Sequence, residues 1–177
     1  VLMANIHPSA VIEDGAQIDP SAVIGPFCVV GPQVVIHADV VLKSHAIVTG
    51  QTEVGAGTVI FSFAVIGEIP QDLKFKGEAS RLVIGKRNRI REHVTMNCGT
   101  EGGGGMTRVG DDGLFMAGCH IAHDAVVGNQ VIVVNNAAVA GQIDLLMKDS
   151  EGHYHIVDFK RTAADLSPGA YAFGKKF

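Results

Sequence analysis

The stretch AVIGPFCVVGPQVVIHADVVLKSHAIV, residues 22–48, repeats one pattern every six residues. In each repeat a branched aliphatic such as Ile24 is followed, four positions later, by a small or branched residue such as Cys28. Neither a helix of 3.6 residues per turn nor an alternating strand keeps such a register for long, whereas a solenoid of short strands does. The aliphatic position is filled without a gap by Ile6, Ile12, Ile18, Ile24, Val30, Ile36, Leu42, Val48, Val54, Ile60 and Ile66.

A β-sandwich with accidental spacing is the alternative to a solenoid, and eleven consecutive aliphatics at one spacing disfavour it. The composition points the same way, because the chain has 22 glycines, no tryptophan and only 6% aromatic residues. A core so poor in rings has to be built from small branched side chains in repeated layers. We therefore predict an all-β solenoid with the aliphatics inside and glycine, proline, asparagine or aspartate at the corners.

Two segments interrupt the six-residue pattern. Residues 68–82 (EIPQDLKFKGEASRL) are rich in charge and lack the spacing, so we expect a loop that projects from the coil. Residues 99–107 (GTEGGGGMT) contain four successive glycines and predict a second excursion. Functional residues concentrate on such loops, which makes both segments candidate parts of a site.

The pattern ends at Gly141, and we divide the chain there. Residues 1–141 form the predicted hexapeptide-repeat domain with its two excursions, and residues 142–177 form a short non-repeat tail. Two of the three cysteines, Cys28 and Cys119, fall on inward positions of the repeat, so we expect buried fillers rather than nucleophiles.

Charge and cysteine content exclude several classes of protein. A net charge of −4 argues against a general nucleic-acid or membrane-surface binder. No apolar run approaches the roughly 20 residues of a membrane span, and we expect no signal peptide because the first residues lack a basic stretch followed by an apolar one. Three scattered cysteines do not make a disulfide framework or a CxxC metal site. We expect a soluble, cytoplasmic protein.

Beyond its repeat, the sequence resembles a known family over residues 6–141, the bacterial UDP-N-acetylglucosamine O-acyltransferases. The matching stretches are IGPFCVVGP (24–32), LKSHAIV (42–48), IGEIPQDLKFKGE (66–78), IGKRNRIREHVTMN (84–97), GGGGMTRVG (102–110), HIAHDAVVGN (120–129) and NNAAVAG (135–141). The resemblance implies a left-handed parallel β-helix with three hexads per coil, assembled as a homotrimer. It also implies transfer of a 3-hydroxyacyl group from acyl carrier protein to the 3-hydroxyl of UDP-N-acetylglucosamine, the first step of lipid A biosynthesis, without a cofactor.

Acyl transfer to a hydroxyl needs a base for its proton and hydrogen-bond donors for the tetrahedral oxyanion. In the hexad IAHDAV the residues between the two inward positions, His123 and Asp124, face outward near a corner. The resemblance assigns His123 as the catalytic base, Asp124 as its orienting partner and His120 as a nearby polar contact. It assigns the oxyanion to the backbone N–H of Gly141, although an ordinary corner glycine is an equally good account of that residue.

The first excursion supplies the implied contacts to the UDP-sugar. Gln71, Asp72 and Lys74 match the family there, and a lysine can pair with a pyrophosphate while an amide and a carboxylate bind sugar hydroxyls. The sequence departs from the family after residue 141, because Gln142 stands where the family has a histidine and the later coils and helical domain do not follow. We therefore expect impaired binding of the acceptor.

The tail resembles the core hairpin of PD-(D/E)XK nucleases. Segments QIDLLMK (142–148) and HYHIVDFK (153–160) predict two strands joined through residues 150–152, with Asp144 opposite Asp158 and Lys160 on the same side. Two carboxylates can hold Mg²⁺ while the lysine positions water, and only this alternative calls for a metal or for nucleic acid. An acidic surface hairpin is the simpler interpretation. A metal-dependent nuclease fragment carried on a scaffold, and a catalytically silent trimeric scaffold, are the alternatives to the acyltransferase.

Overall fold

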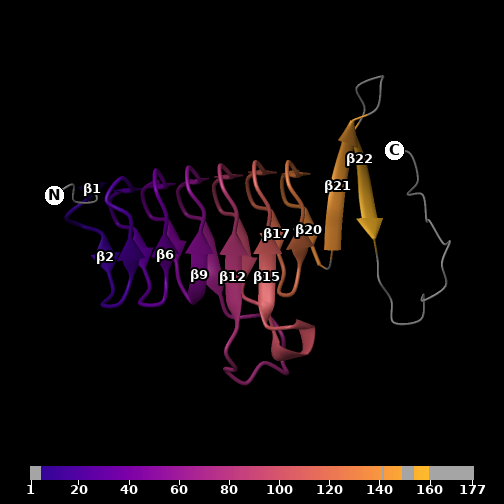
Figure 1. Cartoon of the computed structure of the whole chain (residues 1–177), viewed down its shortest axis with the longest axis horizontal. Coiled ribbons are helices and arrows are strands. Elements are labelled where there is room, and N and C mark those ends of the chain that lie inside the picture. Colours follow the sequence, from indigo (N-terminus) through magenta and orange to yellow (C-terminus); the bar gives the residue numbers. More distant parts are fainter. Residues whose placement is uncertain (1–4, 141, 149–153, 160–177) are drawn as a thin grey trace.

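The computed structural model describes residues 5–140 and, for the backbone alone, residues 142–148 and 154–159. Nearly every element is a strand of two to four residues, and the coils follow one another along a single axis (Figure 1). The elements are β1 (Asn5–Ile6), β2 (Val11–Ile12), β3 (Gln17–Ile18), β4 (Val23–Ile24), β5 (Val29–Val30), β6 (Val35–Ile36), β7 (Val41–Leu42), β8 (Ile47–Val48), β9 (Gln51–Val54), β10 (Val59–Ile60), β11 (Val65–Glu68), β12 (Arg81–Ile84), β13 (Arg89–Ile90), β14 (Thr95–Asn97), the 3₁₀ helix η1 (Glu101–Gly103), β15 (Met106–Val109), β16 (Leu114–Phe115), β17 (His120–Ile121), β18 (Val126–Val127), β19 (Ile132–Val133), β20 (Ala138–Val139), β21 (Gln142–Lys148) and β22 (Tyr154–Phe159).

Three parallel sheets run the length of this prism. Each coil contributes one strand to each sheet, so that β1, β4, β7, β10, β13, β16 and β19 make the first sheet. The pairs join residues 18 apart, as in Ile6 with Ile24 and Ile24 with Leu42. Three hexads therefore complete one coil, and the fold is the left-handed parallel β-helix that the family resemblance implies.

The predicted inward positions form the core. From Ile24 to Val139 the residues at the aliphatic position are at most 5% exposed, and Phe115 takes the same position without breaking the series. Ile6 differs, with 37% of its surface exposed, because β1 stands at the end of its sheet and has a neighbour on one side only. Cys28 and Cys119 are buried as predicted, and burial raises the pKa of the Cys119 thiol to about 11.

The corners require an unusual backbone conformation from ordinary residues. At ten corners the third residue after the inward aliphatic has a positive φ, between 56° and 64°, which L-residues seldom adopt. The next residue then enters the buried small position, so the conformation is imposed by the turn of the coil. The ten are Phe27, Asp39, His45, Phe63, Arg87, His93, Asp112, Asp124, Gln130 and Asn136.

Both excursions leave the prism on the same side (Figure 1). They are shorter than predicted, because Glu68 ends β11 and residues 81–82 and 106–107 belong to β12 and β15. Leu82 and Thr107 fill the buried position two residues before an inward aliphatic, and they pair with each other in register. Backbone hydrogen bonds from Arg81 N to Gly105 O and from Gly99 N to Arg81 O join the bases of the two loops.

The tail adds a hairpin to the third sheet. Strand β21 pairs in parallel with β18, and β22 pairs antiparallel with β21. The predicted register holds from Leu145 onward but is wrong nearer the prism, because a shift between Ile143 and Leu145 places Ile143, not Asp144, opposite Asp158. The predicted connection at 150–152 lies outside the described residues. Within the described part of the chain, no helix has the length and apolar character of a membrane span.

Candidate active site

The corner between β17 and β18 carries the histidine and aspartate singled out from the sequence. Ile121 and Ala125 are both fully buried, and the backbone turns between them with Asp124 at a φ of 60°. The side chains of His123 and Asp124 therefore point away from the core, with exposures of 31% and 20%. The coil thus presents an imidazole and a carboxylate side by side, partly shielded from water.

These two side chains make a direct hydrogen bond. His123 Nδ1 lies 2.9 Å from Asp124 Oδ2. An ionised carboxylate only accepts, so this contact places a proton on Nδ1 and leaves the lone pair of a neutral ring on Nε2. A base for a hydroxyl proton has this form.

Asp124 is held by more than the histidine. The N–H of Thr100 donates to Oδ1 and its hydroxyl donates to Oδ2, both at 2.6 Å, while the N–H of Asp124 donates to Thr107 Oγ1 at 2.9 Å. Burial acts to raise the pKa of the Asp124 carboxyl, but the Thr100 donors and His123 outweigh it and leave that pKa below its usual value. The carboxylate is consequently charged at neutral pH.

A second histidine lies on the adjoining strand. His120 is in β17 opposite Thr95 of β14, and its Nδ1 is 2.8 Å from Thr95 Oγ1. Burial lowers the pKa of His120, and the nearby His123 lowers it further. His120 is therefore a neutral hydrogen-bonding group beside the His123–Asp124 pair at neutral pH, which suits a contact to an uncharged hydroxyl.

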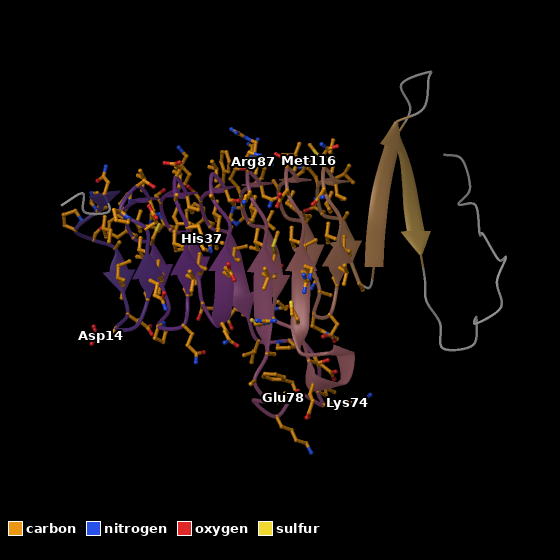
Figure 2. The ribbon with its side chains drawn as sticks, viewed as in Figure 1. Asp14, His37, Lys74, Glu78, Arg87 and Met116 are labelled. Carbon is orange, nitrogen blue, oxygen red and sulfur yellow. The ribbon has the colours of Figure 1, made fainter. Side chains whose placement is uncertain are left out.

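The first excursion carries the predicted acceptor contacts outward into solvent. Gln71 and Lys74 are exposed and Asp72 is half-buried, with Asp72 Oδ1 accepting a hydrogen bond from the Lys74 N–H at 2.9 Å. Figure 2 shows Lys74 at this projecting loop, on the side of the prism opposite Arg87. The start of the loop is tied down by Asn97, whose Nδ2 donates to Ile69 O at 2.9 Å.

The other four predicted site residues follow residue 140 in the sequence. Gly141 and Lys160 lie outside the described residues, and Asp144 and Asp158 are described in backbone only. Where side chains are described, no cluster of three histidine, cysteine or carboxylate groups is arranged to hold a metal ion. The metal ligands and the oxyanion donor therefore stay predictions.

Three threonines that hydrogen bond to the predicted site residues were not predicted from the sequence: Thr100 and Thr107 contact Asp124, and Thr95 contacts His120. Thr107 could have been found, because it occupies the small position of the coil beneath Asp124. Thr95 could also have been found, since it stands 25 residues before His120 in the same sheet. Thr100 carried no signal of its own, because it lies on an excursion whose path the six-residue period does not describe.

The six-residue repeat makes the N-terminal coils similar to a known family of transferases. The family model for the bacterial transferase hexapeptide (six repeats) matches residues 4–44.

The more particular likeness is to UDP-N-acetylglucosamine O-acyltransferases, as the motifs predicted. The chain is 61% identical over 109 residues to acyl-(acyl-carrier-protein)–UDP-N-acetylglucosamine O-acyltransferase of Paracoccus denitrificans, a match that covers 59% of this chain and 42% of the relative. The UDP-N-acetylglucosamine acyltransferase of Francisella novicida superposes with a TM-score of 0.77 at 42% identity, covering 78% of this chain and 51% of that one. The UDP-N-acetylglucosamine acyltransferase of Campylobacter jejuni superposes with a TM-score of 0.74 at 46% identity, covering 78% of this chain and 54% of that one. The chain thus spans about half the length of these relatives.

Proposed function

We propose that this chain carries the transfer site of an O-acyltransferase that moves a 3-hydroxyacyl group from acyl carrier protein to the 3-hydroxyl of UDP-N-acetylglucosamine, the reaction that opens lipid A biosynthesis. The observation that carries the proposal is the hydrogen bond between His123 Nδ1 and Asp124 Oδ2 at an outward corner. The likeness to the enzymes of Paracoccus denitrificans and Francisella novicida supports it.

In the proposed reaction, His123 Nε2 takes the proton of the sugar 3-hydroxyl as that oxygen attacks the carbonyl carbon of the thioester. The negative charge of Asp124 stabilises the imidazolium that forms. When the tetrahedral intermediate collapses, the C–S bond breaks and the sulfur leaves with the proton from His123. The products are the 3-O-acylated sugar nucleotide and the free thiol of the carrier protein, with no change of oxidation state, and the proposed reaction uses no cofactor.

The other predicted residues complete the proposed site. The backbone N–H of Gly141 would donate to the oxyanion, and Lys74 would pair with the pyrophosphate of the acceptor. Gln71, Asp72 and the neutral His120 would bind hydroxyl or amide groups of the nucleotide sugar. Assembly as a homotrimer in the cytoplasm belongs to the same proposal.

A matched pair of variants tests the assignment of His123. His123→Ala should lower kcat by about 10²- to 10⁴-fold, the usual contribution of a general base, and leave the KM for UDP-N-acetylglucosamine nearly unchanged. His37→Ala is the control, because His37 also bonds a carboxylate, Glu53, at 2.7 Å, but at another corner of the coil, after β6. Transfer would be followed with radiolabelled UDP-N-acetylglucosamine and a 3-hydroxyacyl carrier protein.

Two results would contradict the proposal. Full-rate transfer by the His123→Ala variant would remove the histidine from the chemistry. No transfer by the unsubstituted chain, with an intact fold by circular dichroism, would favour a catalytically silent scaffold.

A further inference from the structure

The glycine-rich excursion lies against the carboxylate of Asp124. Its 3₁₀ helix η1 begins after Thr100, and the Thr100 hydroxyl accepts a hydrogen bond from Gly103 N at 3.2 Å. The hydroxyl has a single proton, which is donated to Asp124 Oδ2 at 2.6 Å. Thr100 is only 7% exposed, so neither bond competes freely with water. The loop conformation therefore determines where this proton points.

The two oxygens of Asp124 are engaged separately. Oδ1 accepts from the Thr100 N–H, whereas Oδ2 accepts from both the Thr100 hydroxyl and His123 Nδ1. Three donors at these positions fix the plane of the carboxylate as well as its distance from the ring. Without the Thr100 hydroxyl, Oδ2 would keep only the half-buried His123 as a partner, and the carboxylate could rotate.

Glycine at position 103 makes this approach feasible. A Cβ added to Gly103 would overlap the Asp124 carboxylate itself. Any other residue would therefore push the loop and the carboxylate apart. The run of glycines, which from the sequence marked only a break in the repeat, brings the excursion into contact with the proposed catalytic corner.

We infer that Thr100 is a positioning residue for acyl transfer: through its N–H and hydroxyl it clamps the Asp124 carboxylate, so that His123 keeps its proton on Nδ1 and turns Nε2 toward the acceptor hydroxyl. This inference rests on the function proposed above. The competing account is that Thr100 serves only as the N-terminal cap of η1. The two accounts differ in what a change at Thr100 does to turnover as opposed to folding.

Kinetics separate the two accounts. Thr100→Val should lower kcat by about tenfold, corresponding to one hydrogen bond to a charged group, with the KM for the sugar nucleotide within about twofold. Thr100→Ser keeps the hydroxyl and should restore most of the rate. Thr58→Val is the control, because the Thr58 hydroxyl is also buried, donates to Gly85 O and accepts from Asn88 N, yet lies in another part of the coil.

A second variant covers the case in which Thr100→Val does not fold. Gly103→Ala leaves every hydroxyl in place but pushes the loop away from the carboxylate, so it should lower kcat in the same manner. Unchanged kcat in the Thr100 and Gly103 variants would overturn the inference. A loss of kcat in Thr100→Val that is explained by its lower Tm, and that disappears at a temperature where the variant is fully folded, would overturn it in favour of the cap alone.

A readout that needs no turnover keeps this test distinct from that of the proposed function. The carboxyl carbon of Asp124, followed by ¹³C NMR during acidification, reports the pKa of that group. Among the described residues His123 is the one titratable side chain that hydrogen bonds to it. Thr100→Val should raise the pKa and Thr58→Val should not. Identical titrations would overturn the inference, whereas an inactive unsubstituted chain with the expected shift would overturn only the proposed function.

Discussion

Replacing Asp124 by asparagine tests how the site sets the proton on His123. The aspartate accepts three hydrogen bonds, but asparagine offers one oxygen and an NH₂ group that only donates. If the NH₂ replaces Oδ1 it faces the Thr100 N–H, which points at that position from 2.6 Å. If it replaces Oδ2 it donates to His123 Nδ1 and drives the ring proton to Nε2, where the base needs its lone pair.

The expected loss of activity follows from these two arrangements. A hydrogen bond to a charged group contributes about 1.5–3 kcal/mol, and each 1.36 kcal/mol corresponds to about tenfold in rate. Loss of the base form adds to this, so kcat should fall by about 10²-fold or more. Asp112→Asn is the control, because Asp112 also occupies a corner at a φ of 60° and accepts hydrogen bonds from Arg87.

The same change predicts a pH dependence of stability. Burial acts to raise the pKa of Asp124 in the folded chain, but hydrogen bonds from Thr100 and His123 outweigh burial and leave that pKa below its usual value. The folded state then binds that proton less readily than the unfolded state, so the aspartate adds stability at neutral pH and loses it as the pH falls through the lowered pKa. The free energies of unfolding of the unsubstituted chain and of Asp124→Asn, measured in urea, should differ by about 1–3 kcal/mol at pH 7 and become equal in acid. Near-normal kcat in Asp124→Asn, or an equal stability difference at both pH values, would refute the reasoning.

Two further predictions concern the core and the tail. Val54→Asp places an unpaired charge at a fully buried position and should lower the free energy of unfolding, measured by urea titration, by several kcal/mol. Val23→Asp is the control, because Val23 is 37% exposed and the same change there should not have this effect. Equal stability of the two variants would contradict the solenoid core. If the hairpin binds metal, Mn²⁺ or Mg²⁺ should slow proteolysis of the tail and Asp144→Asn should abolish that protection, whereas rates independent of metal would leave an acidic surface hairpin.

The six-residue period was enough to predict the coil, because the inward residue of each strand is set by local geometry alone. Ile24 and Val139 lie 115 positions apart in the sequence, and both are buried because both occupy the inward aliphatic position of a hexad. The outward position of His123 and Asp124 follows from the same rule, since they lie in the corner between the inward residues Ile121 and Ala125.

Contacts made by the loops could not be predicted in this way. The bonds from Thr100 to Asp124 depend on the path of a glycine-rich segment, and a glycine allows many paths. The register of the tail was wrong at Asp144 for a similar reason, because one unpaired residue in a strand shifts all the pairs beyond it.

The two loops have a consequence for how such a chain can change. Neighbouring coils pair residues 18 apart where no excursion intervenes. An excursion lies between Ile60 and Ile90, and another between Ile90 and Phe115, yet these residues still pair at the same position of the coil. Extra residues at a corner therefore leave the stacking of the prism intact, and the energetic effect of lengthening one stays within the adjoining coils. The ligand bound by a loop at a corner can therefore change, in evolution or by design, without changes to the buried residues of the coil. Proteins whose loops pack against a shared core seldom allow this independence.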